Sequence, residues 1–486
     1  MNVLALLTVA LPMAGAALCL LLPDRLARLT SHATAGATAL VALILAGIAL
    51  ANPSDRIVGK FVLVDATSGV FLAVIAVVGL VSALLSPGYL ATSDRSVFPA
   101  RRAHSGYYAT FHVFWALLLA IPIAGNLGTA WLLIEATTAA SALLVAFSGR
   151  RSALEAGWKY LVLTTLGLTI SLLGIVVLFV AAAPEGGSFA TLDWQSLPDA
   201  VARIDRQTAI VALALIITGL ATKIGWAPVH HWLPDAHSEA PPPVSALLSA
   251  ALLPTVLLVA WRVKDVFDPA LGERTGQTLM IGFGLISLAV AVPFLWRPLP
   301  WKRLLAYSTL EHMGVIALGI GFGHPVAIAG VVLHVAGHAL AKALGFWAAV
   351  PLLALQPQTA RIPPSGLARS SPATAGAVGL SLASLAGLPP SPLFFSEIFV
   401  LFGGALAGQL WVSVVAGVLL ALGFLGLAHS TIEGLVGRRR RVVAGATSRS
   451  TLAIVGVAGV GLVCLAALAA FLPGSDLIEQ IARWPG

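Results

Sequence analysis

Fourteen long apolar stretches limit what this chain can fold into. An α-helix needs roughly 20 mainly apolar residues to cross a bilayer, and the stretches are of about that length or longer. With 58% hydrophobic and only 10% charged residues, the composition excludes a soluble enzyme, a disordered chain and a fibrous protein. The sequence therefore predicts an all-α polytopic membrane protein with about 14 transmembrane helices. The stretches lie near residues 3–22, 34–51, 62–85, 107–124, 127–147, 160–183, 208–227, 241–262, 277–296, 303–322, 325–350, 372–406 (interrupted), 410–429 and 451–472.

Nothing in the composition marks a second domain or a cofactor site. No linker is long enough to separate a soluble domain, so residues 1–486 are predicted to form a single membrane domain. The two cysteines, Cys19 and Cys464, lie in apolar stretches at opposite ends of the chain. Two thiols are too few for an iron–sulfur cluster or a zinc–thiolate site, so we expect no cofactor in this chain.

Basic residues between the stretches predict the orientation in the membrane. Cytoplasmic loops carry an excess of Lys and Arg. If the N-terminus is outside, the cytoplasmic loops contain 18 of these residues, and the outer loops with the C-terminal tail contain 8. Both termini are therefore expected on the outer (periplasmic or extracellular) side of the cell membrane. The net charge of +8 is attributed to topology and not to nucleic-acid binding.

The clearest ionisable residues inside the apolar stretches are Glu135, Lys223, Lys342 and Glu397. Such a side chain at a helix centre costs at least ~2.5 kcal/mol on insertion scales, so its presence indicates a function. His334 and His338 precede Lys342 at intervals of four residues, which places all three on one helix face. Because histidine and desolvated lysine both exchange protons near neutral pH, this face is interpreted as part of a proton path.

A metal pair is the alternative interpretation of His334 and His338, because ligands at i and i+4 suit zinc. No acidic residue or third histidine that would complete such a site is evident beside them in the sequence. The proton-path interpretation is therefore preferred, and no metal site is predicted.

Prolines interrupt two of the stretches. The seventh breaks at Pro228, shortly after Lys223, and the twelfth breaks at Pro389 and Pro390, shortly before Glu397. Irregular backbone persists at membrane depth only where protein or water satisfies its polar groups. Interrupted segments at matching places in two halves are typical of transporters built from inverted repeats. We therefore predict discontinuous helices 7 and 12 in two inverted five-helix repeats.

The five-helix separation of the breaks gives the expected limits of these repeats. Residues 107–262 would form the first repeat, with helices 4–8, and residues 277–429 the second, with helices 9–13. Helices 1–3 in residues 1–106 and a fourteenth helix at 451–472 would lie outside the repeats.

Two segments resemble the signature of the antiporter-like membrane subunits of respiratory complex I and of Mrp cation/proton antiporters. They are KIGWAPVHHWLPDAHSEAPPPVSALLSAALL at residues 223–253 and KRLLAYSTLEHMGVIALGIG at residues 302–321. The resemblance covers roughly residues 60–430 and implies a core of fourteen helices that translocates ions.

Details of these segments favour one subgroup. LEHMG at 310–314 and PVSALLS at 243–249 resemble component F of hydrogenase 4 and the membrane subunits of formate hydrogenlyase. Glu397 matches the acidic version of the twelfth-helix residue. The chain departs from complex I subunits at Ser249, where His is usual, and at Pro254, where others carry Lys. The residue that usually carries protons at the centre of the eighth helix is therefore missing. Either water bridges Lys223 to His334, or the path conducts protons poorly.

The resemblance also implies roles for single residues. Glu135 and Lys223 would form the input pair, whose separation and closure lets the lysine release and take up a proton. The helix with His334, His338 and Lys342 would connect the two halves, and Glu397 would pass the proton out. Further candidates along this path are His230, His231, Asp235, His237, Lys302, Glu311 and His312.

The function expected from the resemblance is ion translocation, of protons or of Na⁺, without redox chemistry in this chain. The chain would be a non-catalytic membrane subunit of a redox-driven complex related to the group 4 [NiFe] hydrogenases. Its partners would be other membrane-arm subunits and a hydrophilic redox module. The alternatives are a NADH-quinone oxidoreductase subunit, an Mrp-type antiporter subunit, or the membrane subunit of an inorganic-carbon transporter.

Overall fold

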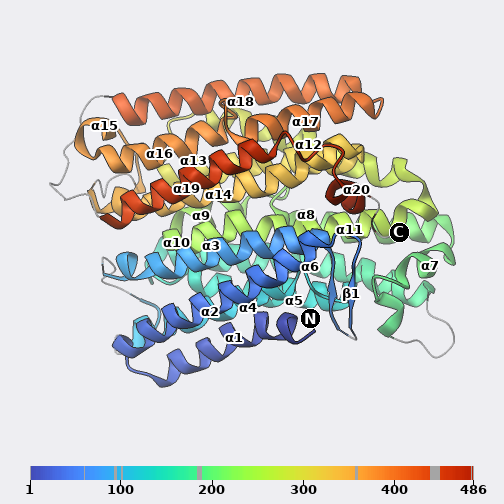
Figure 1. Cartoon of the computed structure of the whole chain (residues 1–486), viewed down its shortest axis with the longest axis horizontal. Helices are drawn as coiled ribbons and strands as arrows, with labels where there is room; N and C mark the ends of the chain where they lie inside the picture. Colours follow the sequence, from blue (N-terminus) through green and yellow to red (C-terminus); the bar gives the residue numbers. More distant parts are fainter. Residues whose placement is uncertain are drawn as a thin grey trace.

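A computed structural model describes residues 2–59, 61–91, 96–99, 102–182, 189–355, 360–437, 449–482 and 484. The helices lie side by side along one direction, with the N-terminal helices at one edge of the bundle and α18 at the other (Figure 1). Each of the fourteen predicted stretches corresponds to one helix or to an interrupted set of helices. The helices are α1 (Asn2–Leu21), α2 (Asp24–Ala51), α3 (Ala66–Leu90), α4 (Ala103–Ala120), α5 (Leu127–Val145), α6 (Arg151–Ala182), η2 (Phe189–Leu192), α7 (Leu197–Ala202), α8 (Arg206–Ile224), α9 (Trp232–Glu239), α10 (Pro242–Leu247), the π-helix η3 (Leu248–Leu252), α11 (Leu253–Leu271), α12 (Glu273–Leu295), α13 (Trp301–Phe322), α14 (Pro325–Leu355), α15 (Leu367–Ser370), α16 (Pro372–Leu385), α17 (Pro392–Leu406), α18 (Leu410–Val436), α19 (Arg449–Leu468) and α20 (Asp476–Ala482).

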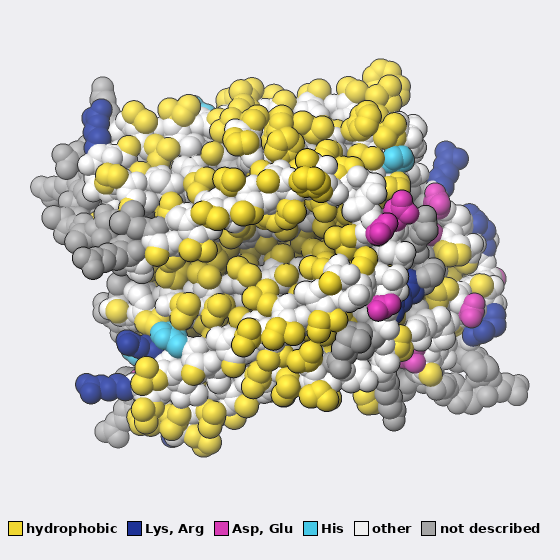
Figure 2. Space-filling view, viewed as in Figure 1, with side chains coloured by type: hydrophobic (Ala, Val, Ile, Leu, Met, Phe, Trp, Pro, Cys, Tyr) yellow, Lys and Arg dark blue, Asp and Glu magenta, His cyan; other side chains and the backbone are white. Residues whose placement is uncertain are grey.

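The surface of the bundle is that of a multi-pass membrane protein. Figure 2 shows hydrophobic side chains over the middle of the visible face and charged side chains at its two ends. Large apolar side chains point outward along the helices, with Trp411 81% exposed and Phe471 75% exposed. Eleven of the described helical segments are long and apolar enough to cross a membrane, and α16, α17 and part of α19 are shorter apolar helices. This polarity fits a lipid solvent around the middle of the bundle.

Both predicted helix breaks are present. Helix α8 ends at Ile224, where Gly225 takes a left-handed backbone with φ +80°, and α9 begins at Trp232. Helix α16 ends at Leu385, and α17 begins at Pro392 with Ser391 as its N-cap. The predicted discontinuous helices 7 and 12 are therefore confirmed. The residue limits given above for the two repeats stay a prediction.

A small hairpin precedes the third membrane helix, where the sequence predicted helix from residue 62. Strands β1 (Ile57–Val58) and β2 (Leu63–Val64) pair antiparallel. Helix α3 begins only at Ala66, because the Asp65 side chain accepts a hydrogen bond from the Ser68 N–H at 2.7 Å and caps the helix. Apolarity marks the membrane depth of a stretch, whereas the cap determines where its helix starts.

Arg262, one of the eight Lys and Arg residues counted above for the outer side, is buried in the helix bundle. Helix α11 continues to Leu271, so Arg262 lies within it and is only 3% exposed. Its guanidinium donates to Asp65 Oδ2 at 2.9 Å and to the Pro122 carbonyl at 3.0 Å. The rings of Trp194 and Trp484 lie 5.9 Å and 5.5 Å from its central carbon. This cluster, which we call the Arg262 cluster, joins α3, α11 and the loop after α4.

Candidate functional site

Lys223 is the centre of the first half of the site. It lies one residue before the end of α8 and is fully buried. Its ammonium nitrogen donates to Thr138 Oγ1 at 2.7 Å and to Tyr160 Oη at 2.5 Å. Because α8 stops here, the lysine ends at the helix break and contacts hydroxyl groups from α5 and α6.

Tyr160 links Lys223 to a second hydroxyl. The Tyr160 oxygen lies 2.7 Å from Ser141 Oγ, and the tyrosine ring centroid is 4.4 Å from the lysine nitrogen. The Ser141 hydroxyl also donates to the Thr137 carbonyl at 2.5 Å. Sequence reasoning missed Tyr160, because a tyrosine at the start of an apolar stretch is typical of a membrane-interface residue. The structure instead places it, fully buried, against the lysine.

Glu135 lies on α5 near this lysine without touching it. Its Oε1 accepts a hydrogen bond from Thr165 Oγ1 at 2.8 Å, while its Oε2 is buried and has no hydrogen-bond partner among the described residues. Glu135 and Lys223 form no ion pair within 4.0 Å in the described part of the chain. The two residues of the expected input pair therefore lie apart in the structure, and the lysine donates to the hydroxyls of Thr138 and Tyr160.

Three histidines form the centre of the second half. The rings of His312, His334 and His338, which we call the central histidine cluster, are fully buried. His312 Nδ1 lies 3.0 Å from His334 Nε2, and the His312 and His338 ring centroids are 4.9 Å apart. His334 Nδ1 lies 2.9 Å from Ser396 Oγ on α17. The cluster therefore joins α13, α14 and the segment after the second helix break.

Lys342 lies one turn beyond His338 on α14 and is also fully buried. Its ammonium nitrogen donates to the Leu305 carbonyl of α13 at 3.0 Å. The one-face arrangement predicted for His334, His338 and Lys342 agrees with the two imidazole rings, which are 14° from parallel with centroids 6.3 Å apart. The lysine amine, however, is directed to the backbone of the neighbouring helix.

Two carboxylates of the second half occupy notches made by glycines. Glu397 Oε2 would lie 2.7 Å from a Cβ at Gly387, next to the second helix break. Glu311 Oε1 would lie only 2.0 Å from a Cβ at Gly423 on α18. The two carboxylates lie within electrostatic range of one another. A larger residue at either position would require the carboxylate to move.

His237 lies between the two halves. It belongs to α9, is fully buried, and neither of its ring nitrogens makes a hydrogen bond to a described residue. Its ring is 6.2 Å from that of Trp232, which in turn is 4.7 Å from that of Tyr160. Lys302, Lys342 and His338 are its charged or titratable neighbours.

The remaining candidates lie around the connection from α8 to α10. Lys302 donates to the carbonyls of Ser238 and Ala240, and so holds the turn between α9 and α10. The rings of His230 and His231 stack with centroids 4.9 Å apart, and His231 is exposed. Asp235 accepts a hydrogen bond from Arg303 at 2.9 Å. His230, His231 and Asp235 therefore lie at the edge of the site, outside its buried centre.

Ser249 and Pro254 occupy the eighth predicted span, where the usual carrier is missing. Ser249 lies in the π-helix η3, and its hydroxyl is 2.7 Å from Thr309 Oγ1 of α13. Pro254 lies at the start of α11 and is buried. A hydroxyl pair thus stands between the halves at this depth in place of a titratable side chain.

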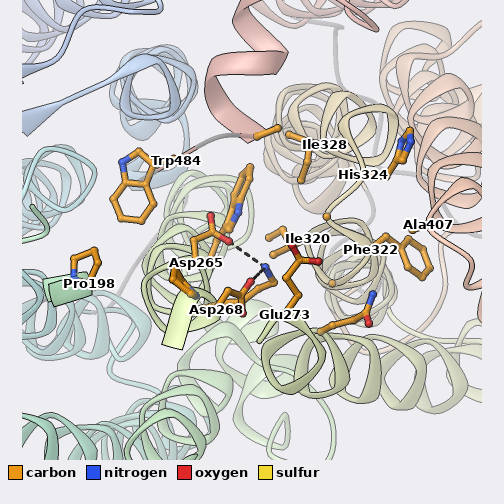
Figure 3. A pocket seen from close by; sticks show the side chains of 17 residues that line it. Pro198, Asp265, Asp268, Glu273, Ile320, Phe322, His324, Ile328, Ala407 and Trp484 are labelled. Atoms are coloured by element: carbon orange, nitrogen blue, oxygen red, sulfur yellow. Dashed lines mark hydrogen bonds and ion pairs between the residues drawn. The ribbon is translucent and has the colours of Figure 1, made fainter. Parts of the chain in front are cut away.

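A cavity of about 770 Å³ opens at the end of the bundle near α7 and α20, the end predicted to face outward (Figures 1 and 3). The acidic residues Asp265, Asp268 and Glu273 line it, and Trp484 lies at its edge. Lys264 pairs with Asp265 at 3.1 Å and with Asp268 at 2.6 Å. Lys264 is another of the eight basic residues counted above for the outer side, but it belongs to α11, because that helix extends nine residues past the apolar stretch.

Comparison with known proteins identifies the family. A family model described as the transmembrane part of NADH:quinone oxidoreductases and Mrp antiporters matches residues 124–423. The hydrogenase-4 component F homolog of Methylacidiphilum infernorum is 33% identical over 374 residues, which cover 76% of this chain and 78% of that protein. NADH-quinone oxidoreductase subunit N of Desulforudis audaxviator is 31% identical over 365 residues, with coverages of 73% and 68%.

The fold agrees with this assignment. A chain of the membrane-bound sulfane sulfur reductase, an archaeal respiratory membrane complex, superposes with a TM-score of 0.83 at 21% identity, over 98% of this chain and 96% of that one. The resemblance predicted from residues 223–253 and 302–321 is therefore confirmed. The chain belongs to the NADH:quinone oxidoreductase/Mrp antiporter transmembrane family.

Proposed function

We propose that this chain translocates protons as a non-catalytic membrane subunit of a redox-driven complex. One observation carries the proposal. Ionisable side chains follow one another from Lys223 at the first helix break, through the fully buried His237 and central histidine cluster, to Glu397 beside the second break. Each such side chain is costly in a membrane interior and is retained only for a function. Membership in a family of oxidoreductase and antiporter subunits supports the same conclusion.

The proposed path starts at Glu135 and Lys223. Movement of Lys223 from Tyr160 and Thr138 to the free oxygen of Glu135 would change the state in which the lysine holds its proton. At an effective dielectric of ~20, the attraction of two such charges about 4 Å apart is ~4 kcal/mol, enough to shift a proton equilibrium by orders of magnitude. The separated arrangement supports Glu135 and Lys223 as a switch.

His237 and the central histidine cluster continue the path. His237 has two unpartnered ring nitrogens and lies between the Tyr160 side and the Lys342 side. It therefore fills, together with water, the gap left by the missing eighth-helix carrier. The cluster hands the proton through Ser396 to the break before α17, where Glu397 releases it. Glu311 in its Gly423 notch provides the acidic neighbour of Lys342, as Glu135 does for Lys223.

The redox partner is proposed to be a hydrogenase-type module. Two observations support this choice. The chain is 33% identical to a hydrogenase-4 component F homolog, and it carries LEHMG at residues 310–314. A quinone-reducing module is the second candidate, because NADH-quinone oxidoreductase subunit N is 31% identical. Na⁺ is the alternative to the proton as the transported ion.

The decisive experiment isolates the chain with its partners. The tagged chain is solubilised from its native membranes in mild detergent, and the copurifying proteins are identified by mass spectrometry. A hydrogenase or quinone-oxidoreductase module, together with proton uptake by closed membrane vesicles during turnover at low Na⁺, is the expected result. Recovery of antiporter subunits alone, or of one zinc protein, would contradict redox-driven pumping and move the function to secondary transport or inorganic-carbon uptake.

Replacing Tyr160 with Phe is expected to lower redox-linked proton uptake about tenfold, less than the ~10²–10⁴-fold of a group that itself transfers the proton, because the hydroxyl only positions Lys223. The ring packing against Trp232 is kept, and only the hydroxyl that bonds Lys223 is lost. Tyr107→Phe is the matched control, because its buried hydroxyl bonds Ser86 away from the path. Initial rates of vesicle acidification report the effect. Equal rates in both variants would remove Tyr160 from the path.

The proposed orientation, with both termini outside, is tested by labelling engineered cysteines. Asp476 is exposed on α20, and Arg369 is exposed near α15. In intact cells, a membrane-impermeant maleimide is expected to label Asp476→Cys but not Arg369→Cys. After permeabilisation of the cells, it is expected to label both variants. The native Cys19 is buried, and a Cys464→Ser background removes the exposed thiol. The reverse labelling pattern would place the termini in the cytoplasm.

A further inference from the structure

The central histidine cluster has the composition of a metal site. One ring nitrogen from each of His312, His334 and His338 lies within 4.8 Å of the other two. His334 and His338 have a zinc-compatible spacing in the sequence, where no third ligand is evident beside them. His312 supplies that ligand from α13, 22 residues before His334. Three neutral imidazoles plus one open position are the donor set of zinc sites that bind a further small ligand.

Hydrogen bonding around His334 prepares one of its nitrogens for a metal. The Ser396 hydroxyl donates to the Leu393 carbonyl at 2.8 Å, so it accepts from the His334 Nδ1–H at 2.9 Å. The Nε2 of a neutral His334 therefore carries a lone pair, and it faces His312. A histidine ligand that donates its other N–H to a fixed acceptor is the usual arrangement around bound metals.

The ring nitrogens of His338 make no close hydrogen bond, although the Ser249 backbone lies near the ring. The ring is fully buried, and neither nitrogen makes a hydrogen bond to a described residue. The Nε2 of His312 is likewise unpartnered. A buried polar atom without a partner costs about 1–3 kcal/mol, and such atoms in native proteins commonly mark a water or an ion.

The geometry and charge suit one ion. Zinc–nitrogen bonds of about 2.0–2.1 Å in tetrahedral geometry place ring nitrogens about 3.4 Å apart. The 3.0 Å separation of His312 and His334 is close to this value, and the other separations close by rotation of the rings. The amine of Lys342 is directed away, to the Leu305 carbonyl.

We propose that His312, His334 and His338 bind one divalent transition-metal ion of the zinc class, and that the bound ion blocks proton transfer. Binding itself is independent of what the chain transports, whereas the block rests on the proposed function. The ion occupies the nitrogens through which the path would pass from α14 to Ser396. A membrane pump would thereby be sensitive to zinc at its centre.

Binding is tested with Co²⁺, whose visible spectrum distinguishes tetrahedral from octahedral sites. The full-length chain is purified in detergent, stripped with a chelator and titrated to equilibrium, because the buried site is expected to load slowly. We expect one Co²⁺ ion per chain, with the intense visible absorption of a tetrahedral site. Zn²⁺ is expected to displace this ion. His312→Gln and His338→Gln should each weaken binding at least about 100-fold, and Ser396→Ala about tenfold. His104→Gln, at a half-exposed histidine, is the matched control.

A further variant distinguishes the loss of a metal ligand from misfolding of the glutamine variants. His338→Cys keeps a zinc ligand at this position, so it should retain Co²⁺ and add a thiolate-to-cobalt charge-transfer band. Wild-type affinity in His338→Gln, an octahedral spectrum in the wild-type chain, or the absence of the charge-transfer band would each overturn the site.

The block is measured on the complex in native membrane vesicles. Zn²⁺ should inhibit redox-linked proton uptake, and Ser396→Ala should raise the half-inhibitory concentration about tenfold on the activity it retains. Tetrahedral Co²⁺ binding without any redox-linked uptake would retain the site and reject the proposed function. If the chain binds Co²⁺ as expected but Zn²⁺ does not inhibit proton uptake, the proposed block of proton transfer is wrong.

Discussion

Replacing Lys223 with Met is expected to lower redox-linked proton uptake by about 100-fold or more, because a positioned proton donor contributes ~10²–10⁴-fold to a transfer step. Methionine has similar length and fills the same buried volume at the end of α8. It removes the only titratable group in contact with Thr138 and Tyr160 among the described residues. Uptake is measured in vesicles, and assembly is checked by copurification of the partner subunits.

The matched control is Lys159→Met on α6. Lys159 is partly exposed, and its ammonium group pairs with Glu155 one turn earlier instead of with the buried hydroxyls that contact Lys223. It is expected to pump at the wild-type rate. Glu135→Gln should resemble Lys223→Met, because it keeps the Thr165 hydrogen bond but removes the charge toward which the lysine moves. Proton uptake at the wild-type rate in both Lys223→Met and Glu135→Gln would contradict the proposed path.

Replacing Arg262 with Leu is expected to destabilise the chain by about 3–5 kcal/mol, because Asp65 would keep its buried charge without a partner. The guanidinium also loses the Pro122 carbonyl and the two tryptophan rings. The expected result is a lower thermal unfolding midpoint of the purified chain and less chain in the membrane. Unfolding is followed in detergent at fixed protein concentration.

Two further variants separate the ion pair from lost packing. Arg206→Leu removes an arginine of the same bundle end that donates to the Leu271 carbonyl, and it should cost far less. Adding Asp65→Asn to Arg262→Leu removes the stranded charge while keeping an N-cap for α3, so it should recover part of the loss. No recovery in the double variant would assign the effect to the tryptophan contacts.

The sequence predicts the fold well because a bilayer leaves few choices. An apolar stretch in lipid must be helical, so all fourteen stretches could be assigned, and buried charges beside prolines identified both breaks. The ends of the helices were less predictable. Helix α6 begins at Arg151 and α2 at Asp24, well before their apolar stretches, because helices continue into the interface where polar residues are tolerated.

The site is only partly readable from sequence, because its members meet across large separations. Glu135, Lys223 and Lys342 stand out as charges in apolar surroundings, and family resemblance adds roles for them. Tyr160 and Ser396 carry no such contrast, and only packing brings them to the lysine and to His334. The same applies to Arg262 and its partner Asp65, which are 197 residues apart.

The notch at Gly423 has a mechanical consequence. The Glu311 carboxylate fills it so closely that any side-chain carbon there would lie 2.0 Å from the oxygen. Sliding α18 past α13 by one residue, a rise of about 1.5 Å, would bring Leu422 or Phe424 toward that oxygen. The Glu311 carboxylate thus packs into the space that the absent side chain of Gly423 leaves. A motion that slides α18 past α13 would therefore have to turn the Glu311 side chain out of this space, which couples the position of α18 to the position of that carboxylate.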